Sequence, residues 1–308
     1  MAIYNEAWFV HQVSDAVVHL AQQKRSRTTG TYRSKEGVVG KTWPFNRLAA
    51  QDMEEVTSRD SDTTYLNPGQ SKRRAILRDF NAAVLLDEFD QVKELPNPES
   101  EFLQMLTFSR ERKKDALVLS VPGRTAAGAA GTGVGGAIGK ATTVDEAAET
   151  TSTGDMLTTQ QILNGGTNLT MAKLRDANEL FQNVDADDED KYFFYSPAGM
   201  KKLLSDTTVT SSDYSSINAL SQGTFPLDAM WMSFKWRLSN RLPKSGNIRS
   251  CIAYAKMGVG FATSAVKEIQ VGPAPHKWNN WQAIAKYTGG MVRVDDNLAV
   301  QIDIDETA

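Results

Sequence analysis

Cysteine and histidine are scarce in this chain, and their scarcity limits the chemistry open to it. Among 308 residues there is one cysteine, and the three histidines are His11, His19 and His276. A single cysteine excludes an intrachain disulfide framework and is typical of a reducing compartment. The histidines are scattered and unaccompanied by cysteine, so neither a zinc site nor a histidine-based triad has its constellation. We expect Cys251, in an apolar run, to be a buried and unreactive thiol.

Long apolar runs and an excess of positive charge are also missing. No segment approaches the roughly 20 consecutive apolar residues that cross a bilayer, and the first residues lack the basic and apolar regions of a secretion signal. The formal net charge is -3, so the chain has no basic footprint of a dedicated nucleic-acid-binding protein. We therefore expect no membrane partner and only non-specific contact with DNA.

What is present begins with an amphipathic N-terminal arm, residues 1–37. Asn5 can cap a helix whose apolar residues recur at helical spacing, namely Phe9, Val13, Val17 and Leu20. The basic cluster Lys24, Arg25 and Arg27 precedes Gly30 at the expected end of this helix. Positive charge suits a helix C-terminus, and contact with an anionic partner is the alternative.

Residues 38–92 predict an extended hairpin loop without an apolar face of its own. Two ribbon strands, residues 39–45 and 72–80, flank a polar tip. A two-stranded ribbon alone is marginal in water, so a long one needs a packing partner, which we expect to be a second copy of the chain. Charge on an edge strand can also simply prevent aggregation. The expected intersubunit contacts are Glu54, Glu55, Arg59, Asp60, Asp62, Lys72, Arg73, Arg74 and Arg78.

A long helix is predicted after this loop. Asn97-Pro98-Glu99 supplies an N-cap, a proline at the first helical position and an acidic first turn. About 22 residues at 1.5 Å each give a rod of roughly 33 Å. Its middle, residues 110–115, is charged all round and should lie on a surface or against a polar partner. Residues 123–154 then turn to Gly, Ala and Thr, which indicates a surface loop or insertion.

The remaining chain predicts a compact α/β region closed by strands. A helix capped by Thr170, a strand over 192–195, a helix from Ser196-Pro197 and a short helix over 212–222 alternate. Period-two alternation predicts one half-buried strand over 230–238. The chain should end on a hairpin of residues 282–294 and 298–304. The fold class is therefore α+β.

The best sequence feature for an enzyme is Gly131–Gly136, which matches G-x-G-x-x-G. A dinucleotide site needs these glycines to open an amphipathic helix, but the following residues contain more glycine and two adjacent threonines. Gly139-Lys140 fails as a phosphate loop, because Ala141 stands where Ser or Thr must bind magnesium. A nucleotide-binding enzyme is the weaker alternative, and we expect no cofactor.

Two further clusters favour structural roles. The acidic residues between Asp185 and Asp190 are as dense as a calcium loop but lack its glycine at the sixth position and glutamate at the twelfth, so a solvated turn is expected. Trp278 and Trp281 could stack on bases or sugars. Aromatic side chains beside a sheet edge more often pack or make subunit contacts, which we favour here.

The order of arm, long loop, capped helix, α/β region and closing strands resembles the major capsid proteins of tailed bacteriophages, the Hong Kong 97-type fold. Residues 59–90 resemble the extended loop and return strand of one group of these proteins. Residues 169–177 followed by 191–197 resemble the helix and strand of their axial domain. The resemblance implies an arm, a loop, a peripheral domain with the spine helix and an axial domain, at residues 1–37, 38–92, 93–122 with 270–308, and 123–269.

The resemblance also implies a function, which is construction rather than catalysis. Hexamers and pentamers of the chain would form an icosahedral head around double-stranded DNA, found in the virion and assembled in the host cytoplasm. Scaffolding, portal and decoration proteins are the implied partners, with Lys24, Arg25 and Arg27 as candidate interior or scaffold contacts. No scaffolding extension or protease segment is visible ahead of the arm, which suggests a separate scaffolding protein or an arm that replaces it. An encapsulin-type nanocompartment, which packages proteins, is an alternative with the same fold.

Overall fold

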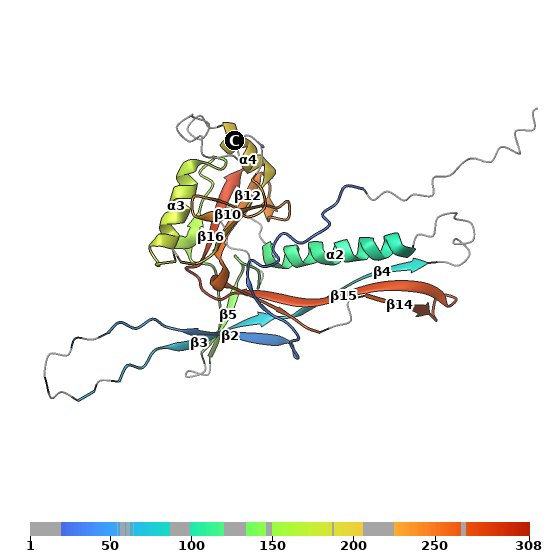
Figure 1. Ribbon diagram of the computed structural model, residues 1–308, viewed down its shortest axis with the longest axis horizontal. Coiled ribbons are helices and arrows are strands. Elements are labelled where there is room, and N and C mark those ends of the chain that lie inside the picture. The colour runs from blue at the N-terminus through green and yellow to red at the C-terminus, as the bar shows by residue number, and fades with distance from the viewer. Residues whose placement is uncertain are drawn as a thin grey trace, which may run out of the picture. The chain divides into compact units, whose positions relative to one another are not determined.

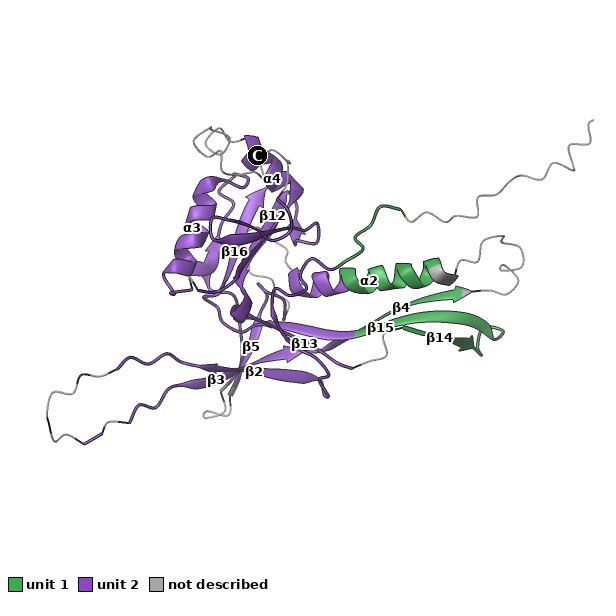
Figure 2. Ribbon diagram, in the orientation of Figure 1, with its two compact units in different colours: residues 1–25, 80–112, 266–287 green, residues 26–79, 113–265, 288–308 purple. Residues whose placement is uncertain are grey.

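The computed structural model places strands and helices in two units (Figure 2). One unit contains residues 1–25, 80–112 and 266–287, and the other contains residues 26–79, 113–265 and 288–308. Three elements run from one unit into the other: β4 (Arg78–Leu86), α2 (Glu99–Leu119) and β15 (Asn280–Arg293). The residues that the structure describes are 20–53, 55, 59, 62–63, 65–86, 99–119, 134–145, 150–186, 188–205, 225–265 and 269–308.

A seven-stranded sheet forms the core of the larger unit, in the order β7-β16-β12-β8-β10-β9, with β11 also paired to β12. The strand β10 runs parallel to β8, whereas β12 is antiparallel to β8 and β16. The helices α3 (Met171–Gln182) and α4 (Pro197–Ser205) flank this sheet (Figure 1). The strands are β7 (Gln161–Ile162), β8 (Lys191–Tyr195), β9 (Ala229–Trp231), β10 (Phe234–Leu238), β11 (Lys244–Ser245), β12 (Ile248–Ala255) and β16 (Ala299–Asp305). Two 3-10 turns accompany them, η2 (Thr158–Gln160) and η4 (Lys256–Gly258).

Local sequence explains why these helices form where they do. The Thr170 side chain accepts from the backbone N–H of Lys173 at 3.5 Å and caps α3. The Ser196 hydroxyl accepts from the backbone N–H of Gly199 at 3.1 Å and does the same for α4. Apolar residues at helical spacing, Leu174, Ala177 and Phe181, are buried on α3, so both predicted helices and the strand after α3 are confirmed.

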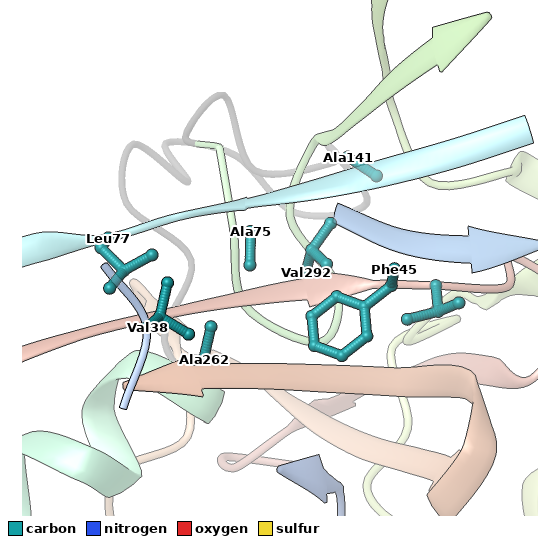
Figure 3. Packing of buried hydrophobic residues seen from close by; sticks show 8 residues of the cluster. Val38, Phe45, Ala75, Leu77, Ala141, Ala262 and Val292 are labelled. Carbon is teal, nitrogen blue, oxygen red and sulfur yellow. The ribbon is translucent and has the colours of Figure 1, made fainter. Parts of the chain in front are cut away.

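The base of the predicted loop belongs to a four-stranded sheet, β2-β3-β5-β6. These strands are β2 (Thr42–Leu48), β3 (Gln70–Ile76), β5 (Ala141–Asp145) and β6 (Thr150–Gly154). A buried apolar cluster packs beside it and includes Val38, Phe45, Ala75, Leu77, Ala141, Ala262, Val292 and Val294 (Figure 3). The expectation that the whole ribbon lacks support from its own chain is wrong for this base, because the Gly- and Thr-rich segment supplies the strand β5 next to β3.

The third sheet has the order β1-β13-β15-β14, with β4 paired to β15. The strands not yet defined are β1 (Arg33–Lys35), β13 (Val259–Thr263) and β14 (Ile269–Ala274). Within the smaller unit, Leu106 of α2 is buried against Ala283 and Ala285 of β15, with Val84 of β4 beside them. This packing confirms the predicted helix, which has 21 residues. No helix in the described part of the chain is long and apolar enough to span a membrane.

Several predictions of local structure need correction. Residues 230–238 form two antiparallel strands, because Met232 and Ser233 take positive φ values of 50° and 67° and turn the chain. The prediction that the last two strands pair as a hairpin is wrong. The strand β15 lies in the third sheet, whereas β16 pairs with β12 in the seven-stranded sheet. The middle of α2 is half-buried, with Asp115 fully buried.

Three predicted helices lie wholly or partly outside the described residues. The predicted short helix 212–222 and the cap at Asn97 lie outside the described residues. The same holds for residues 1–19 of the N-terminal arm. Residues 20–27, which the helix of the arm was expected to reach, contain no helical residue.

Candidate functional site

The tip of the extended loop carries large apolar side chains in water. At the point where β2 and β3 end, the Ala49 N–H donates to the Gly69 carbonyl oxygen at 2.9 Å. Beyond that bond the side chains of Met53 and Tyr65 are 99% and 89% exposed. Glu55, Arg59 and Asp62 are exposed as the sequence predicts, while Glu54 and Asp60 lie outside the described residues. A large exposed apolar patch rimmed by polar residues marks a surface that binds a protein partner, and Met53 and Tyr65 are candidates for such a patch.

The four basic residues predicted at the base of the loop separate into different environments. Arg74 and Arg78 are exposed, and Arg78 Nη2 donates to the Val134 carbonyl oxygen at 3.0 Å. Lys72 is half-buried. Arg73 is only 6% exposed, and its Nη1 donates to Asp296 Oδ1 at 2.8 Å and to the Arg293 carbonyl oxygen at 3.0 Å. Because this guanidinium is enclosed and paired within its own chain, we withdraw Arg73 from the intersubunit contacts.

A second buried arginine completes this cluster. The Nε of Arg293 donates to Asp296 Oδ1 at 2.5 Å, and its Nη1 donates to the Gly139 carbonyl oxygen at 2.7 Å. Burial alone would raise the pKa of Asp296, but hydrogen bonds and positive charge from Arg73 and Arg293 outweigh it and lower the pKa to about 2. Burial lowers the pKa of Arg293, and Asp296 partly offsets that effect. The cluster joins β3, the end of β15 and the segment before β5.

The glycine-rich segment has a structural use, and its described part does not fit the nucleotide-binding alternative. Gly135 and Gly136 take positive φ values of 100° and 78°, and a Cβ on Gly135 would lie 3.0 Å from the Met291 carbonyl oxygen. Residues 135–139 form no helix and lead into the strand β5. A dinucleotide site requires a helix to begin at these glycines. The described half of the motif therefore lacks the geometry that the nucleotide-binding alternative needs.

The start of the larger unit is held by a buried carboxylate. Asp115 accepts hydrogen bonds from Ser26 Oγ at 2.5 Å, from the Arg27 N–H at 2.9 Å and from Thr28 Oγ1 at 2.8 Å. Arg237 Nη1 donates to the Arg27 carbonyl oxygen at 2.6 Å. This anchor could not be predicted from the sequence, because no local pattern relates residue 115 to residues 26–28. The side chains of the predicted basic cluster, Lys24, Arg25 and Arg27, are exposed.

The second exposed feature is the tip of the hairpin formed by β14 and β15. Trp278 is 88% exposed, and Trp281 and Val271 are also exposed. Packing within the described chain therefore does not account for Trp278, which leaves the other predicted roles, a subunit contact or base stacking.

The described residues give no support to metal or thiol chemistry. They contain no group of three or more His, Cys, Asp and Glu side chains arranged to hold a metal ion. Burial raises the pKa of the Cys251 thiol to about 12, in agreement with a buried and unreactive group. The predicted acidic turn lies between α3 and β8, and its Asp190 pairs with Lys235 at 2.6 Å.

Comparison with known proteins identifies the family. The model of the phage capsid protein family matches residues 6–306. The chain belongs to this family. It is a major capsid protein with the Hong Kong 97-type fold, as the order of its elements predicted, and the family match favours neither the encapsulin nor the enzyme alternative. No curated protein matches the sequence.

Solved structures place the fold of this capsid protein among phage capsids. The capsid of Ralstonia phage GP4 superposes with a TM-score of 0.68 at 11% identity, covering 99% of this chain and 98% of that chain. The capsid of cyanophage P-SCSP1u gives 0.63 at 15% identity, covering 96% and 93%. The cyanophage Pam1 capsid gives 0.66 at 12% identity, covering 98% of both chains. The match extends over nearly the whole length of each chain.

Proposed function

We propose that this capsid protein assembles as hexamers and pentamers into the icosahedral head of a tailed phage that encloses double-stranded DNA. The observation that carries the proposal is the loop tip, residues 49–69, where Met53 and Tyr65 are almost fully exposed in a single copy. Apolar side chains of this size gain free energy when a neighbour removes them from water, about 25 cal/mol per Å² of apolar surface. A lattice of copies provides that neighbour at every loop.

The charged residues of the loop would fix how neighbouring copies meet. Glu55, Arg59, Asp62, Arg74 and Arg78 are exposed and remain our proposed intersubunit contacts, together with Lys72, Glu54 and Asp60. Charge pairs of this kind contribute more to orientation and partner choice than to affinity. The net charge of -3 limits contact with packaged DNA to weak and non-specific interactions.

We infer the remaining parts of the assembly from the resemblance to other capsid proteins. Scaffolding, portal and decoration proteins would complete the head in the host cytoplasm, and the mature protein would reside in the virion. The exposed Lys24, Arg25 and Arg27 would face the interior or a scaffold. We keep the arm as residues 1–37 and the loop as 38–92, and we assign β16 (residues 299–305) to the axial domain, because it lies in the seven-stranded sheet.

The test is assembly of the purified full-length chain, viewed by negative-stain microscopy with and without scaffolding protein. We expect closed shells from the wild type. The variant Met53→Ser/Tyr65→Ser should keep the circular dichroism spectrum and melting temperature of the unassembled subunit but form no stable shells. Normal shells from this variant, or a wild type that forms only small oligomers under every condition, would contradict the proposal.

Charge and cargo are tested separately. Arg74→Glu should weaken assembly most at low salt. Interactions between exposed charges are screened over about 8 to 10 Å at physiological ionic strength, and this screening weakens as salt is removed. Arg175→Glu, an equal charge reversal on the exposed side of α3, is the control for net charge. Particles from infected cells should hold nuclease-protected DNA, whereas protein cargo without DNA would support a nanocompartment instead.

A further inference from the structure

An asparagine followed by glycine lies in an exposed turn between β7 and α3. The turn is closed by the Thr167 N–H, which donates to the Asn164 carbonyl oxygen at 2.9 Å. Gly165 and Gly166 occupy its centre with φ values of 54° and 67°, and both are exposed. Glycine adopts such φ values without a steric cost. Water therefore reaches the peptide bond between Asn164 and Gly165.

Three donors converge on one oxygen atom of this turn, the Asn164 carbonyl oxygen. Besides the Thr167 N–H, the Thr167 hydroxyl donates to it at 2.9 Å, and so does Lys173 Nζ at 2.9 Å. The Lys173 side chain belongs to a residue that is only 6% exposed, so water screens its charge poorly. A carbonyl oxygen has two lone pairs, and three donors, one of them a cation, exceed what a neutral amide requires. Donors arranged in this way stabilise negative charge that develops on an oxygen atom.

The ammonium group of Lys173 is held beside this oxygen by further carbonyls. Its Nζ also donates to the carbonyl oxygens of Thr167 at 2.9 Å, Asn168 at 3.1 Å and Asp303 at 2.9 Å. Three N–H groups are thus shared among four carbonyl oxygens. Because Asp303 belongs to β16, the charge is fixed to the seven-stranded sheet and does not move into solvent.

The two groups that would react in this turn are not held by other contacts. Within the described chain, neither the Asn164 side chain nor the Gly165 N–H makes a hydrogen bond. Attack of a backbone nitrogen on the side-chain carbon of the preceding asparagine closes a five-membered ring. Glycine lacks a Cβ, so it hinders this attack least. Asn164 is the one asparagine of the sequence that glycine follows.

We propose that Asn164 is a site of self-modification, which deamidates through a cyclic succinimide formed with the Gly165 nitrogen. Hydroxide first removes the Gly165 amide proton, and the negative charge spreads onto the Asn164 carbonyl oxygen, where the three donors stabilise it. The nitrogen then forms a bond to Asn164 Cγ, and the Cγ–Nδ2 bond breaks. Water protonates the departing nitrogen, which leaves as ammonia, and hydroxide is regenerated. A second water molecule opens the ring and leaves aspartate or isoaspartate.

The product changes the turn in charge and in length. It adds one negative charge close to Lys173, and isoaspartate also adds a methylene group to the backbone. The reaction needs only the folded subunit, so this inference goes beyond the proposed function and does not depend on shell formation. In a shell every copy carries the same site, so the modified fraction would increase with the age of the particle.

The test incubates the full-length protein in ¹⁸O-labelled water and then digests it in ordinary water for mass spectrometry of the peptides. We expect ¹⁸O at residue 164 and accumulation of an isoaspartate peptide. Two exposed asparagines are internal controls. Asn67 precedes a proline, which has no N–H to lose, and Asn240 precedes the bulky Arg241. Absence of label at Asn164, or equal labelling at Asn240, would overturn the proposal.

A second comparison tests the donors. Thr167 is exposed, so its side chain can be changed without disturbing the core. Thr167→Val keeps the backbone N–H but removes the hydroxyl, and deamidation should slow about two- to tenfold, the scale of one hydrogen bond. Thr167→Ser keeps the hydroxyl and should react at the wild-type rate. In urea-unfolded chains the three proteins should react equally, because the donors are no longer held in place.

These rates also decide against the proposal in two cases. If folded wild type and folded Thr167→Val react equally fast, the donors do not stabilise the reacting peptide. If Thr167→Val is slower in the unfolded chain by the same factor, the effect comes from the neighbouring sequence and not from the fold. Neither result bears on shell assembly, so the proposed function would stand.

Discussion

At the scale of single residues, buried carboxylates connect segments that are distant in sequence. Asp115 is fully buried, and its acceptors are satisfied by Ser26, Arg27 and Thr28. We predict that Asp115→Asn destabilises the unassembled subunit by about 3 kcal/mol, because hydrogen bonds to a charged group each contribute about 1.5–3 kcal/mol. Urea denaturation measures the loss, and faster tryptic cleavage at the exposed Arg27 would accompany it.

The control for Asp115→Asn is Asp176→Asn on the exposed side of α3, which removes the same charge. Equal stability of the wild type and Asp115→Asn would show that residues 26–28 are held by other contacts. Loss of stability without faster cleavage would show that the carboxylate matters to the core but does not anchor this segment.

The arginine cluster at the loop base gives a prediction about pH. The pKa of Asp296 is about 2 in the folded chain, against an ordinary value of 3.8, so the folded state favours the ionised carboxylate. Its stabilising effect is complete above pH 4 and is lost as the pH falls toward 2. By linkage the effect is about 2 kcal/mol. Asp296→Asn should therefore be less stable than the wild type by at least this amount at pH 7.

The measurement for Asp296 is urea denaturation of unassembled wild type and variant between pH 7 and pH 2. The difference in the free energy of unfolding should shrink below pH 4. Asp295→Asn, one residue earlier, controls for the removal of a negative charge. A wild-type advantage that stays constant down to pH 2 would mean that Asp296 is not the titrating group.

At the scale of elements, the close approach of β15 to the corner between β3 and β4 depends on a glycine. A Cβ on Gly290 would lie 2.0 Å from the Ile76 carbonyl oxygen, and backbone cannot move aside as a side chain can. We predict that Gly290→Ala costs at least about 3 kcal/mol of folding stability, beyond ordinary overpacking. Gly272→Ala on β14 is the control, since its Cβ would have nothing within 4 Å. Similar thermal stability for both variants would contradict the backbone approach.

Some of the helices and strands could be predicted from the sequence, and others could not. The helices at 99–119, 171–182 and 197–205 and the strand 191–195 were predictable, because caps and periodicity are local signals. The pairing of β5 with β3 was not predictable. The Thr-rich segment forms a strand here only because it pairs with a segment that is distant in the sequence. The turn at Met232 and Ser233 was also missed, since neither residue is typical of positive φ.

The candidate site was predictable only in part. The exposure of the loop tip, residues 49–69, followed from its many polar and charged residues. The enclosure of Arg73 did not, because its partner Asp296 is more than two hundred residues away in the chain. A loop arginine and a buried arginine look alike in sequence, and only the fold distinguishes them. The same limit applies to Trp278, whose positive φ of 53° has no signature in composition.

At the scale of the whole molecule, the proposed contacts of the loop would make apparent stability depend on concentration. A folded subunit that binds other folded subunits, but not unfolded chains, is stabilised by mass action, by about 2.7 kcal/mol at one hundred times the dissociation constant. We predict that the melting temperature of the wild type rises with each tenfold increase in protein concentration once shells form. Met53→Ser/Tyr65→Ser should melt at one temperature throughout, equal to that of dilute wild type. If the wild-type melting temperature stays constant when shells appear, assembly does not stabilise the folded state. If the melting temperature of the variant rises together with that of the wild type, the stabilising contacts lie away from the loop tip.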